Sequence, residues 1–492
     1  MPGYLKKYLL ILLPAAYLIS CGRTPAGNVT ETGRTPVINP DYSGVTVPYN
    51  IAPLNFKIAE PATYYIARFS CGSGIQFDVK SSNGSITIPE NKWKKMLEAS
   101  KGSGYSMEIF LRDKSGSWSK FSPITNIVAS EPVDPYVTYR ILYPGYESWK
   151  EISINQRSLE SFREKPIIEN SIADENCINC HSYNNTGNNR DFMFHMRGSM
   201  GGTYFLTGNG FRKVNLKTKE MANGAVYPRW HPSGRFVAFS SNRIVQQFHS
   251  ALSKKVEVSD LESSLVLYDV DKNEIMNIDL PGKENFMDTY PEWSPDGKYL
   301  YFCRAPEPGK IFIYDQIRYD LYRIAFDPEA RKFGEAELIF NASAIGKSVS
   351  FPRISPDGRF LILTLHNYGS FPIWHKEADL YSIDLNSRDT TRLALNSDYT
   401  DSYHSWSSNS RWLIFSSKRL DGLTAGLYIS YIGQDGNSGK PFILPQKDPE
   451  FYSGFLKTFN LPEFSTFKID VRPGILRRSV SGKAIQAKWA GQ

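Results

Sequence analysis

The sequence is poor in cysteine and histidine, has no long hydrophobic run behind its N-terminal segment, and concentrates neither sign of charge. Its 492 residues include only 5 Cys and 7 His. No later stretch approaches the roughly 18 apolar residues of a membrane-spanning helix, which excludes such a helix in the body of the chain. The 57 basic and 50 acidic residues are dispersed. This dispersal argues against a nucleic-acid partner, which would need a basic patch.

Sequence motifs of several enzyme classes are also missing. The chain contains no Gly-x-Ser-x-Gly nucleophile elbow, no phosphate-binding Walker loop and no His-Glu-x-x-His helix. It does contain 14% aromatic residues, with 36 Gly and 30 Pro. This composition favours short strands and many turns over helices. We therefore predict an all-β protein, with two or three domains for this length.

The N-terminus has the features of a secretory signal. Two lysines precede the apolar run 8–19, which is too short to span a membrane stably. The run ends in a sequence that resembles a bacterial lipobox, Leu18-Ile19-Ser20-Cys21-Gly22. The resemblance implies removal of residues 1–20 and attachment of lipid to the thiol of Cys21. The alternative is a plain signal peptide with an incidental cysteine.

The segment that follows the lipobox is polar. Residues 21–43 are rich in Thr, Gly and Pro without apolar periodicity, which predicts a flexible tether. By resemblance to bacterial lipoproteins, the absence of Asp after Cys21 implies an outer-membrane lipoprotein. The absence of an acidic run implies that it faces the periplasm. The membrane is therefore an expected partner through the lipid.

A thirteen-residue pattern occurs four times in the second half of the chain. The copies start at Tyr227, Tyr290, Phe351 and Tyr403, so successive starts are 63, 61 and 52 residues apart. Each copy has a strand ending in an apolar residue, a turn of the Ser-Pro-Asp-Gly type, and a second apolar strand. Pro presets φ, Asp bonds its own backbone and Gly accepts positive φ, which specifies a hairpin. A strand repeat of this length indicates a propeller or an array.

These copies resemble the repeats of TolB-like β-propellers over about residues 201–446, although the last copy is degenerate at Ser408-Asn409-Ser410. The resemblance implies one four-stranded blade per repeat. Four blades do not close a ring comfortably, so strands within 139–158 and 464–471 are expected to complete about six blades in residues 131–492. Ahead of the propeller, residues 44–130 alternate strands with Gly/Ser turns. They predict a small immunoglobulin-like or fibronectin-like β-sandwich.

One motif carries chemistry, the pentapeptide Cys177-Ile178-Asn179-Cys180-His181. Cys-x-x-Cys-His is the attachment sequence of c-type haem, whose vinyl groups take the two thiols at a spacing that one turn of backbone can present. The adjacent imidazole then ligates the iron. Export agrees with this interpretation, because c-type haem is attached outside the cytoplasm. Three alternatives are a disulfide between the two cysteines, a zinc site without a second cysteine pair, and a thioredoxin-like redox pair without its βαβ context.

The residues after the pentapeptide supply candidates for the second iron ligand. His195 lies fourteen residues after His181 and is the first candidate. Its competitors are three thioethers, Met193, Met196 and Met200. Arg197 can pair with a haem propionate. Ordinary packing or solvent exposure is the alternative role of each residue, and together with the pentapeptide they predict a haem-binding insertion over about residues 169–202.

The predicted function is periplasmic electron transfer or redox sensing, with covalent haem c as cofactor and an envelope or redox protein as partner. The alternative is a propeller that binds a glycan, a peptide or an envelope protein, with a structural Cys-x-x-Cys pair. The fold does not decide between them, because propellers serve both purposes. No catalytic residue is predicted.

Replacing the lipid acceptor tests the predicted anchor. A Cys21→Ser variant lacks the thiol, so lipid attachment is expected to be lost while export persists. The measurement is the distribution of the protein between membrane and soluble fractions. Retention of the variant in the membrane fraction at the level of the unchanged chain would contradict the lipobox assignment.

Overall fold

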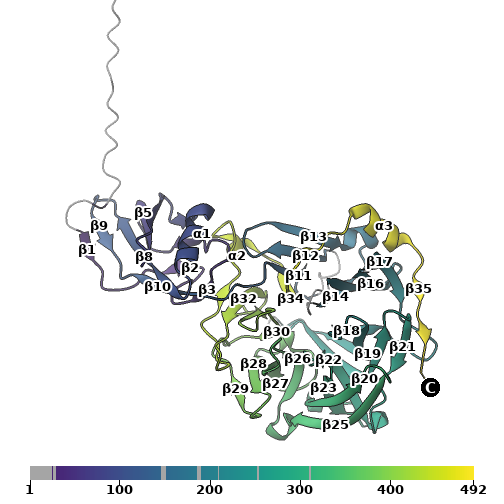
Figure 1. Cartoon of the computed structure of the whole chain (residues 1–492). Helices are drawn as coiled ribbons and strands as arrows, with labels where there is room; N and C mark the ends of the chain where they lie inside the picture. Colours follow the sequence, from purple (N-terminus) through teal and green to yellow (C-terminus); the bar gives the residue numbers. More distant parts are fainter. Residues whose placement is uncertain are drawn as a thin grey trace, which may run out of the picture.

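The computed structural model describes residues 25, 29–145, 151–184, 190–208, 210–251, 254–309 and 312–491. Strands dominate these ranges and form eight sheets, two in an N-terminal domain and six around a common centre (Figure 1). The predicted all-β, propeller-type fold is therefore confirmed. Within the same ranges, no helix is long and apolar enough to cross a membrane. The signal segment and Cys21 lie outside the described residues.

The N-terminal domain contains a seven-stranded and a three-stranded sheet. Two long antiparallel strands, β5 (Tyr64–Cys71) and β8 (Ser103–Arg112), form the centre of the larger sheet. Its other strands are β1 (Val29–Glu31), β3 (Thr46–Pro48), β6 (Gln76–Ser81), β9 (Trp118–Lys120) and β10 (Ile124–Ala129). The smaller sheet has β2 (Ile38–Asn39), β4 (Phe56–Ile58) and β7 (Ser85–Ile86). Helix α1 (Glu90–Ala99) contributes its buried face, with Trp93, to the core.

Residues 29–43 belong to this domain, which corrects the prediction of a flexible tether over 21–43. Strand β1 pairs with β9, and Tyr42 is only 2% exposed. Asn126 holds the segment, because its amide donates to the carbonyl of Tyr42 at 2.9 Å and accepts from the backbone N–H of Val45 at 3.0 Å. Thr, Gly and Pro here form edge strands and turns, which composition alone does not separate from a linker.

Six antiparallel sheets form the rest of the fold, two of them extended by short C-terminal strands. The first sheet contains β34 (Thr458–Ser465), β11 (Tyr136–Leu142), β12 (Ser153–Ser158) and β13 (Glu164–Glu169), and the second β14 (Ile178–Asn184), β15 (Asp191–Met196), β16 (Gly202–Thr207) and β17 (Gly210–Asn215). The third contains β18 (Ala225–Trp230), β19 (Phe236–Phe248), β20 (Val256–Asp269) and β21 (Glu274–Asn277), and the fourth β22 (Phe286–Trp293), β23 (Tyr299–Pro306), β24 (Asp320–Asp327) and β25 (Lys332–Phe340). The fifth contains β26 (Ser348–Ile354), β27 (Phe360–His366), β28 (Asp379–Asp384) and β29 (Thr390–Arg392), and the sixth β30 (Asp401–Trp406), β31 (Trp412–Ser417), β32 (Gly426–Tyr431) and β33 (Phe442–Ile443).

The inner strands of these sheets form a closed ring. Strands β14, β18, β22, β26 and β30 each contact the next, and β34 contacts both β30 and β14. They gather at the centre of the propeller in Figure 1. Closure comes from the first sheet, in which β34 pairs with β11 from Tyr136↔Ser465 to Leu142↔Thr458. The closing C-terminal strand is therefore 458–465 rather than the predicted 464–471.

The Ser-Pro-Asp-Gly turns specify the first hairpin of each repeat. Between β22 and β23, Ser294 Oγ donates to Asp296 Oδ1 at 2.6 Å, and Gly297 has φ 73°. In the next repeat Ser355 Oγ donates to Asp357 Oδ1, also at 2.6 Å. The side-chain bonds and the positive φ fix the reversal, as the turn chemistry predicts.

Tryptophans at the ends of the inner strands connect neighbouring sheets. A buried indole N–H needs an acceptor, and here each one donates to a carbonyl of the preceding inner strand. The pairs are Trp230 to Ser182 at 3.4 Å, Trp293 to Arg229 at 3.2 Å and Trp406 to Arg353 at 3.1 Å. These bonds hold adjacent sheets at a fixed spacing around the ring.

The degenerate fourth repeat contacts residues 131–134, which connect the N-terminal domain to the first sheet of the propeller. Its Ser408 backbone N–H donates to Asp134 at 2.9 Å, and Asn409 donates to the carbonyl of Pro132 at 2.6 Å. Trp412 on β31 donates to the carbonyl of Glu131 at 3.3 Å. The departure from Ser-Pro-Asp-Gly therefore supplies contacts to the segment that links the two domains, whose direct contacts include the ion pairs Lys57–Glu450 and Asp41–Lys440.

The C-terminal segment runs along the outer edges of two sheets. Short helices α2 (Phe451–Gly454) and α3 (Pro473–Ser481) flank β34. Strand β35 (Ile485–Gln486) then pairs with β17, and β36 (Lys488–Trp489) pairs with β21. This segment therefore joins the second and third sheets at their outer edges.

Two glycines at equivalent turns provide a matched test of this packing. An added Cβ at Gly297 would meet the ring of His231 at 2.4 Å, whereas at Gly358 the nearest atom, of Pro295, is 4.0 Å away. Both have positive φ, 73° and 74°. Gly358→Ala is expected to cost about 1 kcal/mol of backbone strain, and Gly297→Ala a further ~1–3 kcal/mol of overpacking. Urea unfolding measures both, and equal losses would contradict the close contact.

Candidate functional site

One residue on each inner strand has a left-handed backbone conformation. These residues have φ from 49° to 52° and are Cys180, Tyr227, Tyr290, Phe351, Tyr403 and Leu461. The pairing register shifts at each of them, which marks six equivalent β-bulges. A bulge redirects a side chain away from the regular alternation. Residues 178–181 of the pentapeptide are therefore part of inner strand β14, and Cys177 immediately precedes it, which corrects the prediction of an insertion over 169–202.

The redirected side chains meet at the axis of the ring. Ring centroids are 4.3 Å apart for Tyr227 and Tyr290, 4.2 Å for Tyr290 and Phe351, and 4.7 Å for Phe351 and Tyr403. Tyr227 and Phe351 come from non-adjacent sheets and are still only 6.0 Å apart. Aromatic rings thus fill much of the channel. Cys180 lies among them and is 4% exposed.

His181 follows the bulge, at a position that holds proline in four of the other five inner strands. It is 6% exposed, and neither ring nitrogen has a hydrogen-bond partner. The carbonyls of Leu461 and Thr138 lie close enough to affect its pKa, but neither completes a hydrogen bond. Burial, with the charges of Arg140 and Arg229, lowers the pKa of His181 to about 3. The imidazole is therefore neutral near pH 7, the form that binds metals.

The two cysteines of the pentapeptide are buried free thiols. The carbonyl of Cys177 accepts from the backbone N–H of Arg197 at 2.9 Å. Between the cysteines, Asn179 Oδ1 accepts from Arg140 Nη1 at 2.6 Å and from the backbone N–H of Cys180 at 2.8 Å. Burial raises the pKa of the Cys180 thiol. The structure does not join the two cysteines in the alternative disulfide.

Two reduced thiols and a neutral, unpartnered imidazole are the donors that a c-type haem requires, so the donor set fits this group. The backbone that carries the two cysteines is a strand, not the single turn that the Cys-x-x-Cys spacing suggested. Strand β14 is extended apart from its bulge, so neighbouring side chains diverge. Cys177 lines a pocket at the channel mouth, whereas Cys180 and His181 line a cavity of about 40 Å³. Tyr227 belongs to the walls of both.

The structure does not bring His195 next to His181. The His181 ring centroid is 6.5 Å from that of Phe192, on one face of the second sheet. His195 is three positions further along β15 and therefore projects from the other face. There its Nδ1 is 3.2 Å from Thr203 Oγ1. A separation of fourteen residues was sufficient in length, but the strand alternation places the two imidazoles on opposite sides.

The other predicted ligands also occupy separate places. Met193 packs between the second and third sheets, whereas Met196 and Met200 pack between the first and second. Arg197 is exposed and lines the pocket at the mouth. Of these four residues, only Arg197 shares a cavity with Cys177.

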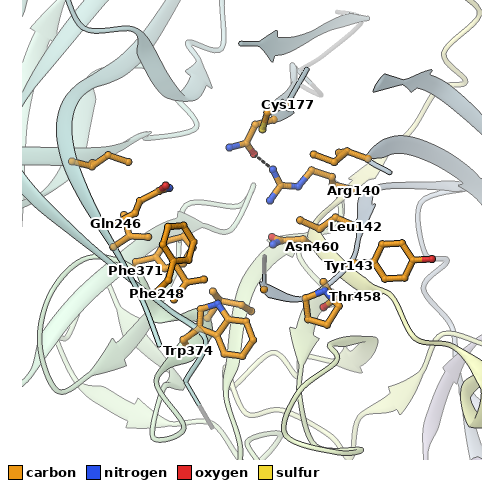
Figure 2. A pocket seen from close by; sticks show the side chains of 18 of the residues that line it. Arg140, Leu142, Tyr143, Cys177, Gln246, Phe248, Phe371, Trp374, Thr458 and Asn460 are labelled. Carbon is orange, nitrogen blue, oxygen red and sulfur yellow. Dashed lines mark hydrogen bonds between the residues drawn. The ribbon is translucent and has the colours of Figure 1, made fainter. Parts of the chain in front are cut away.

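The mouth pocket, defined as the cavity lined by Cys177 and Arg140, has a volume of about 170 Å³. Figure 2 shows these two residues at one end and Trp374 at the other. Its apolar walls include Ile244, Phe248, Val256, Val258, Phe371 and Ile373. Its cationic groups are Arg140, Arg197 and Lys418, and no Asp or Glu is among the described residues that line it.

The opposite end of the channel carries a ring of polar residues two positions after each bulge. They are Ser182, Arg229, Glu292, Arg353, Ser405 and Glu463. Arg229 pairs with Glu292 at 2.6 Å and with Glu463 at 3.3 Å. Burial raises the pKa of both glutamates to about 7, although Arg229 opposes the shift. Charges are balanced at this end, in contrast to the cationic mouth.

Histidines elsewhere in the ring do not form a metal site. Among the described residues, no three His, Cys, Asp or Glu side chains are placed to hold a metal ion. His366 and His375 have ring centroids 5.0 Å apart, but they bond to Ser350 at 3.2 Å and to Glu377 at 3.2 Å, respectively. The zinc alternative therefore has no support in this part of the chain.

Two sequence similarities point to this ring outside the four repeats. Residues 180–183, Cys-His-Ser-Tyr, correspond to residues 403–406, Tyr-His-Ser-Trp. Residues 461–465, Leu-Pro-Glu-Phe-Ser, correspond to residues 290–294, Tyr-Pro-Glu-Trp-Ser. Neither is followed by a Ser-Pro-Asp-Gly turn, so the thirteen-residue pattern does not find them. Lys418 has no comparable signal, because a single lysine after a buried strand is unremarkable in sequence.

His404, the counterpart of His181, yields a test of the buried channel. Its Nε2 donates to the carbonyl of Ile362 at 2.9 Å, and burial lowers its pKa to about 3. The unfolded chain, with a pKa near 6.5, binds the proton first, so stability is lost as pH falls from about 6.5 towards 3. His404→Gln should remove one such contribution, ~2 kcal/mol between pH 6.5 and 5. Urea unfolding at both pH values measures it, and an unchanged pH dependence would contradict the burial.

Comparisons with known proteins assign no family. No family model matches the sequence, and no curated protein matches it. Prolyl oligopeptidase B from Galerina marginata is similar with a TM-score of 0.35 and 10% identity, over 76% of this chain and 44% of that chain. The Dos1 propeller is similar with a TM-score of 0.32 and 11% identity, over 56% of this chain and 66% of that chain. This chain thus spans less than half the length of the oligopeptidase, and its activity does not transfer.

Proposed function

We propose that this chain carries covalent haem c through Cys177 and Cys180, with His181 as an iron ligand, and serves in electron transfer or redox sensing in the bacterial envelope. The bound group would supply one-electron redox chemistry. The chain's own contribution is to present both thiols unbonded, to keep the imidazole neutral, and to bury all three.

The observation that carries the proposal is the pair of unpartnered nitrogens on His181. A buried polar group without a partner costs about 1–3 kcal/mol. His404, at the equivalent position, satisfies its Nε2 through the carbonyl of Ile362. Iron ligation at His181 would offset the cost of burying its unpartnered nitrogens. Four of the other five inner strands have proline at this position.

The charges at the mouth support the same assignment. Arg140 and Arg197 line the pocket beside Cys177, without an acidic lining residue among those described. A guanidinium matches the two oxygens of a carboxylate, so both arginines suit the propionates of a haem.

The location and the finer architecture are part of the proposal. We take the six sheets as six blades of a TolB-like propeller and the N-terminal domain as an immunoglobulin-like or fibronectin-like spacer. Lipid on Cys21 would hold this spacer at the outer membrane, facing the periplasm. An envelope or redox protein would then be the partner.

One observation favours a second candidate function, in which the propeller binds a ligand and the Cys-x-x-Cys pair is structural. Cys180 occupies a bulge that five other inner strands form without cysteine. In that reading the thiol only fills space at the axis. Haem content separates the two candidates.

Expression with and without a c-type maturation system tests the haem. The matured chain is expected to gain the mass of one haem and a pyridine haemochrome spectrum. Cys177→Ser and Cys180→Ser should each lose one thioether bond, whereas Cys71→Ser, which alters a thiol outside the channel, should leave the spectrum unchanged. In the same preparation His181→Ala should alter the visible spectrum and His404→Ala should not.

A colourless protein of unshifted mass from a maturation-competent host would contradict the proposal. So would a matured His181→Ala protein with the spectrum of the unchanged chain, because iron would then be held without this imidazole. If the Cys71→Ser control also lost the haem spectrum, the losses in the other cysteine variants would be explained by misfolding and not by a missing haem thioether.

A further inference from the structure

The end of the mouth pocket opposite Cys177 contains a buried lysine without a partner. Lys418 follows β31 and is 3% exposed, and its Nζ makes no hydrogen bond. The amine stands over the ring of Trp374, 3.1 Å from the centroid. A buried amine without an acceptor is costly, so its retention here needs an explanation.

The surroundings keep this amine from acquiring an internal counter-ion. Asp421 is the charged group that acts on it, and burial outweighs that charge and holds the pKa of Lys418 well below its usual value. Arg140 and Arg197 line the same pocket and add positive charge. An acceptor for Lys418 must therefore come from outside the chain.

A second unpartnered atom belongs to a residue that lines the same pocket. Asn460 Oδ1 is buried and has no hydrogen-bond partner, and Asn460 lines the pocket between the two ends (Figure 2). Polar groups without partners thus occur beside apolar walls of Phe371, Ile373 and Trp374. A few polar groups in a mostly apolar cavity are characteristic of a small-molecule site.

The size of the cavity limits the ligand. A cavity of about 150 Å³ can hold benzene, so the 170 Å³ of this pocket corresponds to one ring or a short branched chain. The pocket is lined by cations, and none of the described lining residues is a carboxylate. A ligand that is an acid is therefore favoured over one that is an amine.

We propose that the Lys418 end of the mouth pocket binds a small organic acid, with its carboxylate on Lys418 Nζ and its apolar body against Trp374 and Ile373. The site is independent of haem, because it lies at the opposite end of the pocket from Cys177.

Binding of this kind is coupled to a proton. Burial holds the pKa of this amine well below its usual value, and a carboxylate beside it favours the ammonium, because the charged pair forms the stronger hydrogen bond. A carboxylate is therefore expected to bind with a net uptake of protons from solution. The charged groups facing this amine are Asp421 on its own segment and Arg140 and Arg197 across the pocket.

Calorimetric titration of the full-length chain with benzoate tests the site. The protein is made without haem maturation, so that the result does not depend on whether the haem proposal is correct. Titration in buffers of different ionisation enthalpy measures the proton uptake. Lys418→Met keeps the length and removes the amine, and should weaken benzoate binding at least tenfold and abolish the proton uptake. Lys376→Met removes an exposed lysine over Tyr399 and should leave the affinity within twofold.

The variant is expected to fold, because it removes a buried amine that lacks a partner, and urea unfolding should give a stability equal to or above that of the unchanged chain. Inorganic phosphate is the second probe and should bind at least tenfold more weakly than benzoate, since it lacks an apolar body. No benzoate binding, binding unaffected by Lys418→Met, or phosphate binding equal to benzoate would each overturn the proposal.

Discussion

A single backbone device, the left-handed residue on each inner strand, determines what lies at the centre of this molecule. A left-handed conformation costs a non-glycine residue about 1–2 kcal/mol, and it recurs at six equivalent positions from Cys180 to Leu461. Each bulge turns one side chain to the axis and leaves the next residue outside the ladder. The residue after the bulge can therefore be a proline, which has no N–H to donate. In β14 it is His181, whose ring nitrogens have no hydrogen-bond partner. The channel, its aromatic filling and both of its ends follow from this repetition.

Within this ring, one strand differs in chemistry while keeping the geometry. Strand β14 replaces the aromatic residue at the bulge with Cys180 and the following proline with His181, and Cys177 precedes it at the mouth. The same cationic mouth contains Lys418, whose amine has no internal acceptor. The far end instead pairs Arg229 with two glutamates. Cys177 and Lys418 line the mouth pocket, whereas Cys180 and His181 line the inner cavity together with Arg229 and Glu463.

The sequence predicts the parts of the fold that local chemistry specifies, and it fails where the specification is long-range. The Ser-Pro-Asp-Gly turns and the alternating strands are sufficient to predict hairpins and a ring of sheets, and the pentapeptide is evident from spacing alone. The tether prediction fails because the backbone at Tyr42 is held by a hydrogen bond from Asn126, more than eighty residues away. The prediction that His195 lies opposite His181 at the iron is wrong, because side chains alternate along β15. Which face of the second sheet His195 occupies depends on where β15 begins, and the sequence does not show this. Lys418 has no local signal at all, since its burial depends on Trp374 from another sheet.

An experimental structure of the matured chain is the most direct test of the central claim, that the bulge of β14 presents the pentapeptide as a haem site at the channel mouth. The account predicts thioether bonds from Cys177 and Cys180 to one haem, iron ligated by His181, and propionates near Arg140 and Arg197. A structure in which the bulge is intact, both thiols are free and His181 faces only the carbonyls of Leu461 and Thr138 would contradict it.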